Sequence, residues 1–515
     1  MNKRIFSIIC LLATMLLISA CSSDDAKGDE KKDDKELIIA IDQNFVTLDP
    51  QDAGDTVSIF GTRSMYEGLV GFDKDMEIVP VLAEDYEISE DALTYTFKLR
   101  KDVTFHDGEP FNAEAVKANY ERIIDEDVRA KRNLQYVDKL EVIDDYEVKF
   151  ILNQPFSAML NKFAMVPFIS PKALGDDSEN IGLNPVGTGP FEFSKWNQGD
   201  SLELVKYDDY WNEDSTNVEK VTYKPVPENG SRVAMLKTGE ADFVYPLPDQ
   251  NIKDLEENDD VVIDQTPSTI ARYVSINTTK EPFNDEKIRK AMNYAVDKNA
   301  YINTINNGFG TILDSTMSSE TQFYSQQETY DFNLDKAKEL MKEAGYEDGF
   351  EAEIWGNTTS ETVQGMEFIK QQLDQINIDV TIKSMEEGTL SDEIYTPETP
   401  EEAKVQMWYV SWSPSSGDAD GATRSLFSSE YYPPNGANTA YYHNEDVDKW
   451  INAANETSDP EEQTSIYANL QSQAYGDAPW IFLASDTILS GHRKGVENVY
   501  VLPDGSVSIS NAQLK

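Results

Sequence analysis

Segments patterned as β-strands alternate with segments patterned as helices from residue 36 onward, and this mixing constrains the fold most strongly. Alternating or β-branched runs predict strands at 36–42, 93–100, 146–152, 201–206, 221–226, 379–384 and 405–410. Apolar faces and capping residues predict helices at 112–124, 285–303, 334–344, 362–376 and 460–475. The interspersion favours α/β lobes with mixed sheets, and residues 36–515 are too many for one hydrophobic core, so at least two lobes are expected.

The N-terminal segment carries targeting features. A basic start precedes an uncharged run over residues 5–20, a pattern typical of a secretory signal peptide and too short for a membrane span. Small residues before Cys21 are similar to a lipobox, so we expect removal of residues 1–20 and lipidation of Cys21; an ordinary signal peptide with an incidental cysteine is the alternative. Residues 21–35 lack aromatic and branched aliphatic side chains, which predicts a disordered tether.

Charge and cysteine content restrict the environment and the partners. The formal net charge is −50, which disfavours binding to nucleic acid and to anionic lipid headgroups. Cys10 would leave with the signal peptide, so no disulfide is expected in the mature chain. The expected location is the extracytoplasmic face of the cell membrane, which is the periplasmic side in a source with two membranes, with attachment through the lipid on Cys21.

Sequence signatures of catalysis and metal binding are weak. The three histidines, His106, His443 and His492, lie far apart and have no metal-binding motif around them, and the sequence contains no Gly-x-Ser-x-Gly motif. Asp418 and Asp420 are expected to cap a helix that starts near Ala419 or to hold a ligand ammonium, rather than to act as an acid and base pair. We therefore expect no enzymatic activity, no cofactor and no metal.

An ordered series of motifs resembles the family of extracellular solute-binding proteins (family 5) that serve ABC importers of oligopeptides, dipeptides, nickel and glutathione. The motifs occupy residues 47–50, 66–69, 82–84, 94–100, 105–108 with 111–113, 185–191, 210–211, 235–241, 289–295, 335–341 and 343–346. Further segments are most similar to the glutathione-binding members of the family, at 272–283, 411–420, 426–428, 433–434 and 438–441. Their order along nearly the whole mature chain makes the resemblance specific.

The resemblance implies a two-lobed, periplasmic-binding-protein-like α/β fold of type II, with an extra subdomain, mixed sheets and a hinge. The large lobe is expected to comprise residues 36–268 and 486–515, with the subdomain at about 69–185, and the small lobe residues 269–485. Crossovers are expected near 268–273 and 484–488. The family also implies a monomer that closes around a small ligand and docks on membrane permease subunits.

The loop after strand 405–410 departs from the pattern of the family's peptide binders. They carry an aspartate three residues after the tryptophan, which pairs with the peptide ammonium; this chain has Ser415 there. The dipeptide binders also carry an arginine in the loop before helix 362–376, and residues 355–360 contain none. Both departures suit the zwitterionic γ-glutamyl end of glutathione, and the groups expected to bind it are Ser413, Ser415, Ser416, the Gly417 N–H and Asp418.

The other candidate ligand-binding residues are cations for the glycine carboxylate and side chains that could wall the cleft. The cations are Arg63 and Arg272, because an arginine can bind a carboxylate with two parallel hydrogen bonds. The wall residues are Tyr66, Trp355, Asn357, Thr358, Tyr409, Trp412 and Tyr441. Core packing is the alternative for each aromatic residue, and a surface ion pair is the alternative for Arg63. Rival functions are a di- or oligopeptide binder, a metal–chelate binder and a secreted hydrolase.

Overall fold

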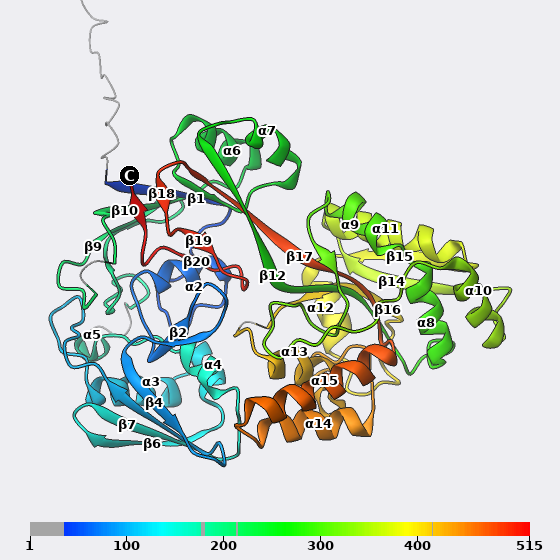
Figure 1. The fold of residues 1–515 in the computed structure, drawn as a ribbon, viewed down its shortest axis with the longest axis horizontal. Helices are drawn as coiled ribbons and strands as arrows, with labels where there is room; N and C mark the ends of the chain where they lie inside the picture. The colour runs from blue at the N-terminus through cyan, green and yellow to red at the C-terminus, as the bar shows by residue number, and fades with distance from the viewer. Residues whose placement is uncertain (1–34, 177–180, 213–214, 415) are drawn as a thin grey trace, which may run out of the picture.

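The computed structural model describes residues 35–176, 181–212, 215–414 and 416–515. One mixed sheet of eleven strands runs through the molecule and joins its two lobes (Figure 1). Its strands lie in the order β15 (Ile378–Met385), β14 (Phe350–Asn357), β16 (Met407–Trp412), β12 (Val261–Ile276), β17 (Trp480–Arg493), β11 (Phe243–Tyr245), β1 (Glu36–Ile41), β10 (Lys220–Pro225), β9 (Ser201–Lys206) and β8 (Phe191–Asn197), with β13 (Thr311–Ile312) beside β17. This architecture confirms the predicted α/β class with a mixed sheet.

We call residues 35–268 and 486–515 the large lobe. Its core begins with β1, whose apolar run pairs in parallel with β10 and β11 and is buried from Leu37 to Ile41. A strand covered on both faces requires such a continuous apolar run. The remaining elements around this core are α2 (Thr56–Arg63), α6 (Asn229–Thr238), η3 (Asp249–Asn251), α7 (Ile252–Glu256), β18 (Val496–Glu497), β19 (Tyr500–Val501), β20 (Val507–Ser508) and β21 (Gln513–Leu514).

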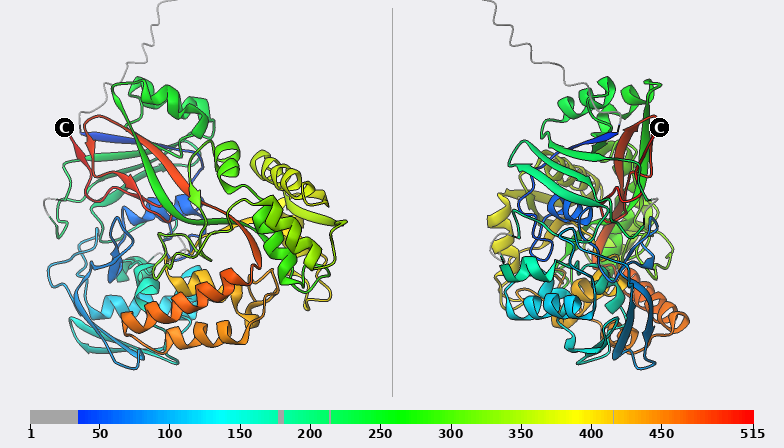
Figure 2. Two further views of the ribbon diagram at one scale, coloured as in Figure 1. Left: turned by 45° about the vertical axis from the view of Figure 1, so that its right-hand side comes forward. Right: turned by 90° about the vertical axis from the view of Figure 1, so that its left-hand side faces the viewer.

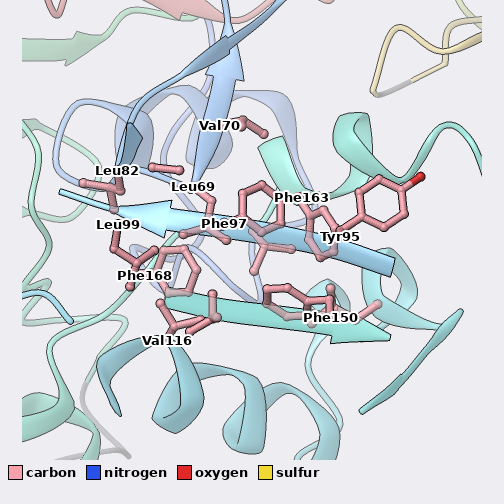
Figure 3. Packing of buried hydrophobic residues seen from close by; sticks show 14 of the residues in the cluster. Leu69, Val70, Leu82, Tyr95, Phe97, Leu99, Val116, Phe150, Phe163 and Phe168 are labelled. Atoms are coloured by element: carbon pink, nitrogen blue, oxygen red, sulfur yellow. The ribbon is translucent and has the colours of Figure 1, made fainter. Parts of the chain in front are cut away.

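A subdomain of the large lobe has a core of its own. Its elements are β2 (Val70–Phe72), β3 (Ile78–Pro80), β4 (Ala83–Ile88), β5 (Thr94–Leu99), α3 (Ala113–Asp125), η1 (Arg129–Leu134), β6 (Val137–Asp144), β7 (Glu147–Leu152), α4 (Met159–Ala164) and α5 (Pro171–Asp176). Strands β4, β5, β7 and β6 form an antiparallel sheet in that order. The Phe163 ring of α4 packs on this sheet, with its centroid 5.3 Å from that of Phe97 and 4.6 Å from that of Phe150 (Figure 3). This packing fixes the position of α4.

We call residues 269–485 the small lobe. Besides β13 to β16 it contains α8 (Glu286–Ala295), α9 (Lys298–Ile305), α10 (Leu334–Glu343), α11 (Ser360–Asp374), α12 (Glu387–Tyr395), α13 (Ala419–Phe427), η4 (Ser429–Tyr431), α14 (Glu445–Asn455) and α15 (Pro460–Gly476). The single helix predicted at 285–303 is wrong. Val296 is extended, and the Asp297 side chain caps α9 by accepting from the Ala300 N–H at 2.9 Å. An aspartate favours an N-cap over a helix interior, so the chain turns there.

Two long strands, β12 and β17, cross between the lobes and pair with each other antiparallel. Their register shifts between Pro267 and Ala271 and again between Arg272 and Tyr273, so the regular ladder is interrupted where the chain passes from one lobe to the other. The predicted crossovers near 268–273 and 484–488 fall in this segment and remain predictions as hinge positions. Within the residues described, no helix is both long and apolar enough to cross a membrane.

Candidate functional site

A cavity of about 980 Å³ lies in the large lobe, between the subdomain and the rest of that lobe. Its walls come from α2 and the segment that follows it, the β2–β3 hairpin, η1, α4, and the chain around β19 and β20. The volume is in the range of pockets that hold small organic ligands. All of its lining residues belong to the large lobe, so the site differs from a cleft formed equally by both lobes.

Two predicted site residues, Arg63 and Tyr66, line this cavity. The Arg63 guanidinium donates to Asp504 at 3.2 Å and to the Ser506 hydroxyl, and it lies 3.3 Å from the Met165 sulfur. The structure therefore shows the alternative stated for Arg63, an ion pair, here with Asp504. The Arg63 side chain nevertheless lines the cavity. The Tyr66 hydroxyl accepts from the Val186 N–H at 3.0 Å, and burial raises the pKa of Tyr66 well above its usual value.

A partly buried carboxylate, that of Glu67, lies beside an aromatic wall of the cavity. It accepts from the Tyr210 hydroxyl at 2.7 Å, from the Trp211 indole N–H at 3.2 Å and from the Thr188 hydroxyl at 2.9 Å. Burial raises the pKa of Glu67 to about 7, because the loss of solvation outweighs the three hydrogen bonds. Near neutral pH this carboxyl group is therefore ionised in only part of the molecules.

The loop after β16, residues 413–418, contacts the large lobe directly. The Lys162 ammonium of α4 donates to Asp418 at 2.8 Å and to the Ser416 hydroxyl at 2.7 Å, and the Asn161 amide donates to the Ser416 carbonyl at 2.9 Å. Ser416 and Asp418 are buried. A second contact joins the Ser157 hydroxyl, just before α4, to the Ala454 carbonyl of α14 at 3.0 Å. The lobes thus touch at α4 and just before it, and Figure 2 shows from two further sides the long strands β12 and β17 that join the lobes.

Asp418 has two roles in this contact. Its carboxylate accepts from the Gly421 N–H at 2.7 Å, which confirms the predicted cap of a helix starting at Ala419. Burial alone would raise the pKa of Asp418, but the charge and hydrogen bonds of Lys162, together with Ser416 and Gly421, hold it below its usual value. An ammonium of the protein itself, that of Lys162, occupies this carboxylate in the structure, and a role of Asp418 in holding a ligand ammonium stays a prediction.

The other polar groups predicted in this loop are also bonded within the protein. The Ser413 hydroxyl bonds the Thr269 hydroxyl at 2.7 Å, the Ser416 hydroxyl bonds Asp418, and the Gly417 N–H donates to the Pro414 carbonyl at 2.9 Å. Ser415 lies outside the described residues. The described polar groups of this loop are thus hydrogen-bonded within the protein, and their binding to a ligand stays a prediction.

None of the four small-lobe members of the predicted aromatic wall lines the cavity, and their contact with a ligand stays a prediction. Trp355 is 1% exposed and packs among Leu390, Ile394 and Val405. The Tyr409 hydroxyl bonds that of Tyr301, and the Trp412 indole donates to the Gly421 carbonyl at 3.3 Å. Tyr441 is buried, and burial raises its pKa to about 12. Strands β14 and β16 lie inside the sheet, so their aromatic residues pack in the core.

Three polar candidates also lie away from the cavity. Arg272 donates to Asp486 at 2.6 Å and forms an ion pair with Glu361 at 3.0 Å, so it links the two crossing strands to α11, and its contact with a ligand carboxylate stays a prediction. The Asn357 amide donates to Glu387 at 3.1 Å, and Thr358 is exposed. Asn357 is the last residue of β14, and Thr358 follows it.

Several cavity residues had not been predicted: Glu67, Arg129, Arg132, Asn133, Lys162 and Trp211. A signal for two of them was present, because residues 129–132 contain three cations in four positions of a strongly acidic chain. No local signal marks Lys162, whose partner Asp418 lies 256 residues away in the sequence.

Comparisons with known proteins agree with the two-lobed architecture. A family model described as bacterial extracellular solute-binding proteins, family 5 middle, matches residues 77–433. The chain is 40% identical over 485 residues to the glutathione-binding protein GsiB of Pectobacterium atrosepticum, an alignment covering 93% of this chain and 94% of that protein. It is 39% identical over 486 residues to GsiB of Salmonella typhimurium, with coverage of 93% and 95%.

Two solved structures share the fold. HbpA2 from Haemophilus parasuis superposes with a TM-score of 0.85 at 26% identity and covers 93% of this chain and all of its own (100%). The periplasmic binding protein DppA from Helicobacter pylori, in complex with the peptide STSA, gives a TM-score of 0.74 at 28% identity, with coverage of 93% and 98%. On the family match and the full-length relatives together, the chain belongs to the bacterial extracellular solute-binding proteins of family 5.

Proposed function

We propose that the protein is the solute-binding component of an ABC importer, and that it captures glutathione or a closely related small peptide and delivers it to a membrane permease. The observation that carries the proposal is 40% identity over 93% of the chain to a protein named for glutathione binding. Similarity of this extent covers both lobes and the whole cavity, rather than one shared motif.

The charges around the cavity support glutathione over an ordinary dipeptide. A dipeptide and glutathione each present one free ammonium, but glutathione carries a second carboxylate and therefore needs cationic partners more than an additional buried anion. The buried carboxylate of the 413–418 loop, Asp418, is already paired with Lys162, and the Glu67 carboxyl is only partly ionised near neutral pH. Arg63, together with Tyr66 and Trp211, instead offers a polar and aromatic wall to a ligand rich in carboxylates.

The mode of action we propose is movement of the two lobes about β12 and β17. A ligand that binds better when the lobes are in contact shifts the population toward that state, and the permease recognises it. The protein acts as a monomer. Residues 1–20 serve as the signal peptide, and lipid on Cys21 holds the protein at the extracytoplasmic face of the cell membrane. Cys21→Ser should release the protein from the membrane fraction, which immunoblotting of cell fractions would measure.

Calorimetry and mass spectrometry test the proposed ligand. The wild-type protein is titrated with reduced glutathione, glutathione disulfide and Ala-Ala, and the ligand that co-purifies is identified by mass spectrometry under native conditions. We expect heat with at least one form of glutathione and much weaker binding of Ala-Ala. Absence of heat with both forms of glutathione would remove glutathione as the ligand.

A second candidate is a general short peptide, favoured by the fold shared with the H. pylori protein in complex with the peptide STSA. It predicts tight binding of Ala-Ala in the same titration and a mixture of peptides among the co-purifying ligands.

A further inference from the structure

The cavity is rich in positive charge although the whole chain has a net charge of −50. Five cationic side chains line it, namely Arg63, Lys74, Arg129, Arg132 and Lys162. Three of these form ion pairs, with Asp504, Asp75 and Asp418 respectively. Among the described residues, no carboxylate lies within ion-pair distance of Arg129 or Arg132. Arg129 and Arg132 therefore differ from the other three cations of the cavity wall, each of which has an acidic partner.

The helix that carries these arginines is held firmly in place. The Ala130 N–H donates to the Gln51 carbonyl at 2.8 Å, and the Arg129 N–H donates to the Asp52 side chain at 3.3 Å. The Asn133 amide donates to the Met165 carbonyl, just after α4, at 3.4 Å. Contacts at both ends of η1 therefore connect it to two other segments of the large lobe, and the backbones of the two arginines are positioned before any ligand arrives.

The two guanidinium groups leave η1 on the same side. In a 3₁₀ helix residues three apart in the sequence eclipse one another, so Arg129 and Arg132 project from one face. Gly54 helps to place the first of them, because a Cβ atom there would lie 2.6 Å from the Arg129 guanidinium carbon. Only a residue without a side chain allows the guanidinium to pack this closely on the backbone.

We propose that Arg129 and Arg132 form a carboxylate-binding subsite, which makes the cavity selective for small peptides with more than one carboxylate. This rests on the proposed function and deepens it. An arginine binds a carboxylate through two parallel N–H donors, and two arginines on one helix face can bind one carboxylate together or two carboxylates side by side. Glutathione carries a carboxylate at each end, whereas a neutral dipeptide carries only one.

The test compares charge-removing variants on η1 in calorimetric titrations. Arg129→Gln and Arg132→Gln remove a cation that lines the cavity, and Lys131→Gln is the matched control, because Lys131 lies between them but does not line the cavity. We expect each arginine variant to bind glutathione about 10- to 100-fold more weakly than the wild-type protein does, as for loss of one partner of a close charge pair. The affinity of the Lys131→Gln control for glutathione should stay within about twofold of the wild-type affinity. Circular dichroism melting of all variants monitors folding.

Glutathione analogues then identify which carboxylate is bound. An amide replaces either the glycine carboxylate or the γ-glutamyl α-carboxylate. If Arg129 and Arg132 bind one of these carboxylates, the analogue in which that carboxylate is an amide should bind the wild-type protein weakly. Its affinity should fall little further in the arginine variants. If Arg129→Gln and Arg132→Gln bind glutathione as tightly as Lys131→Gln does, the subsite does not exist.

A different set of results is expected if glutathione is not the ligand. In that case the wild-type protein binds neither form of glutathione, and Glu-Glu and Ala-Ala serve as probes on the same variants. A preference of the wild-type protein for Glu-Glu that disappears in Arg129→Gln and Arg132→Gln would uphold the subsite while glutathione is rejected. No preference for the added carboxylates would overturn it.

Discussion

The 413–418 loop of the small lobe and the part of the cavity wall formed by η1 (the η1 wall, Arg129–Leu134) differ in whether their charged side chains are paired. In the loop, Asp418 is buried and its carboxylate is bound by Lys162, Ser416 and the Gly421 N–H. On η1, Arg129 and Arg132 have no carboxylate partner among the described residues and line the cavity. The loop therefore serves as a contact between the lobes, while the wall that keeps its charges unpaired is the surface suited to an anionic ligand.

The largest effect should come from a residue that was first predicted to contact ligand. Trp355→Ala removes an indole that is 1% exposed in the small-lobe core, so we expect a loss of about 3–5 kcal/mol in the free energy of unfolding. Affinity for glutathione at a temperature where the protein remains folded should not change, and Trp355→Phe should lie between the two in stability. Denaturant unfolding and calorimetry together measure this. A large loss of affinity with little loss of stability would indicate instead that the ligand contacts the small lobe at Trp355.

Lys162→Met should separate the lobes. It leaves the buried Asp418 carboxylate without its cation, and we expect a cost of about 2–3 kcal/mol for lobe contact, below the range for fully buried pairs because the Lys162 side chain is 19% exposed. The lobes can avoid this cost by moving apart, so the radius of gyration from small-angle X-ray scattering should increase.

The double variant Lys162→Met with Asp418→Asn should restore much of the contact, since the asparagine still caps α13 and carries no charge. Lys131→Met serves as the control for loss of a lysine. An unchanged radius of gyration in Lys162→Met would show that the ion pair does not hold the lobes together.

Glu67→Gln should flatten the pH dependence of stability. The pKa of Glu67 is raised from 4.5 to about 7, so the folded state binds more protons than the unfolded state between these values. The contribution to stability is complete below about pH 4.5 and is lost as the pH rises through 7, by roughly 3 kcal/mol. Urea unfolding at several pH values from 5 to 8 should show this slope in the wild-type protein and in Glu84→Gln, an exposed control, and a smaller slope in Glu67→Gln. Equal slopes in all three proteins would be inconsistent with a raised pKa at Glu67.

Gly54→Ala gives the smallest effect and the finest test of the η1 wall. The added methyl displaces the Arg129 guanidinium without changing any charge, so affinity for glutathione should fall by roughly threefold, ~0.7 kcal/mol. In the Arg129→Gln background the same substitution should have no further effect, because the displaced group is gone. Calorimetry on the wild-type protein, the two single variants and the double variant measures the coupling. Additive losses of affinity would show that Gly54 does not act through Arg129.

Elements with strong local patterns were predictable from the sequence. The alternation in residues 94–99 and the Asn112 cap gave β5 and α3 within one or two residues, and Asp418 was recognised as a possible helix cap. The break between α8 and α9 was missed, because helix-forming and apolar residues lie on both sides of Asp297. Only the hydrogen bond by which Asp297 caps α9 shows that the chain turns there.

The candidate site was less predictable, because its determinants are contacts between distant segments. Local sequence shows a tryptophan at 355 but does not distinguish a cavity wall from an interior strand covered on both faces. It shows the acidic loop but not Lys162, which reaches it from α4 in the other lobe. The basic cluster at 129–132 was visible, but its orientation depends on the bonds that join η1 to Gln51 and to Met165.

A crystal structure of the protein with glutathione bound tests the central claim most directly. We expect the ligand in the large-lobe cavity, with a carboxylate within hydrogen-bond distance of Arg129 or Arg132 and with Lys162 still bonded to Asp418. A ligand seated on the 413–418 loop, with its ammonium on Asp418 and Lys162 displaced, would contradict the assignment of the loop to lobe contact and of η1 to ligand binding.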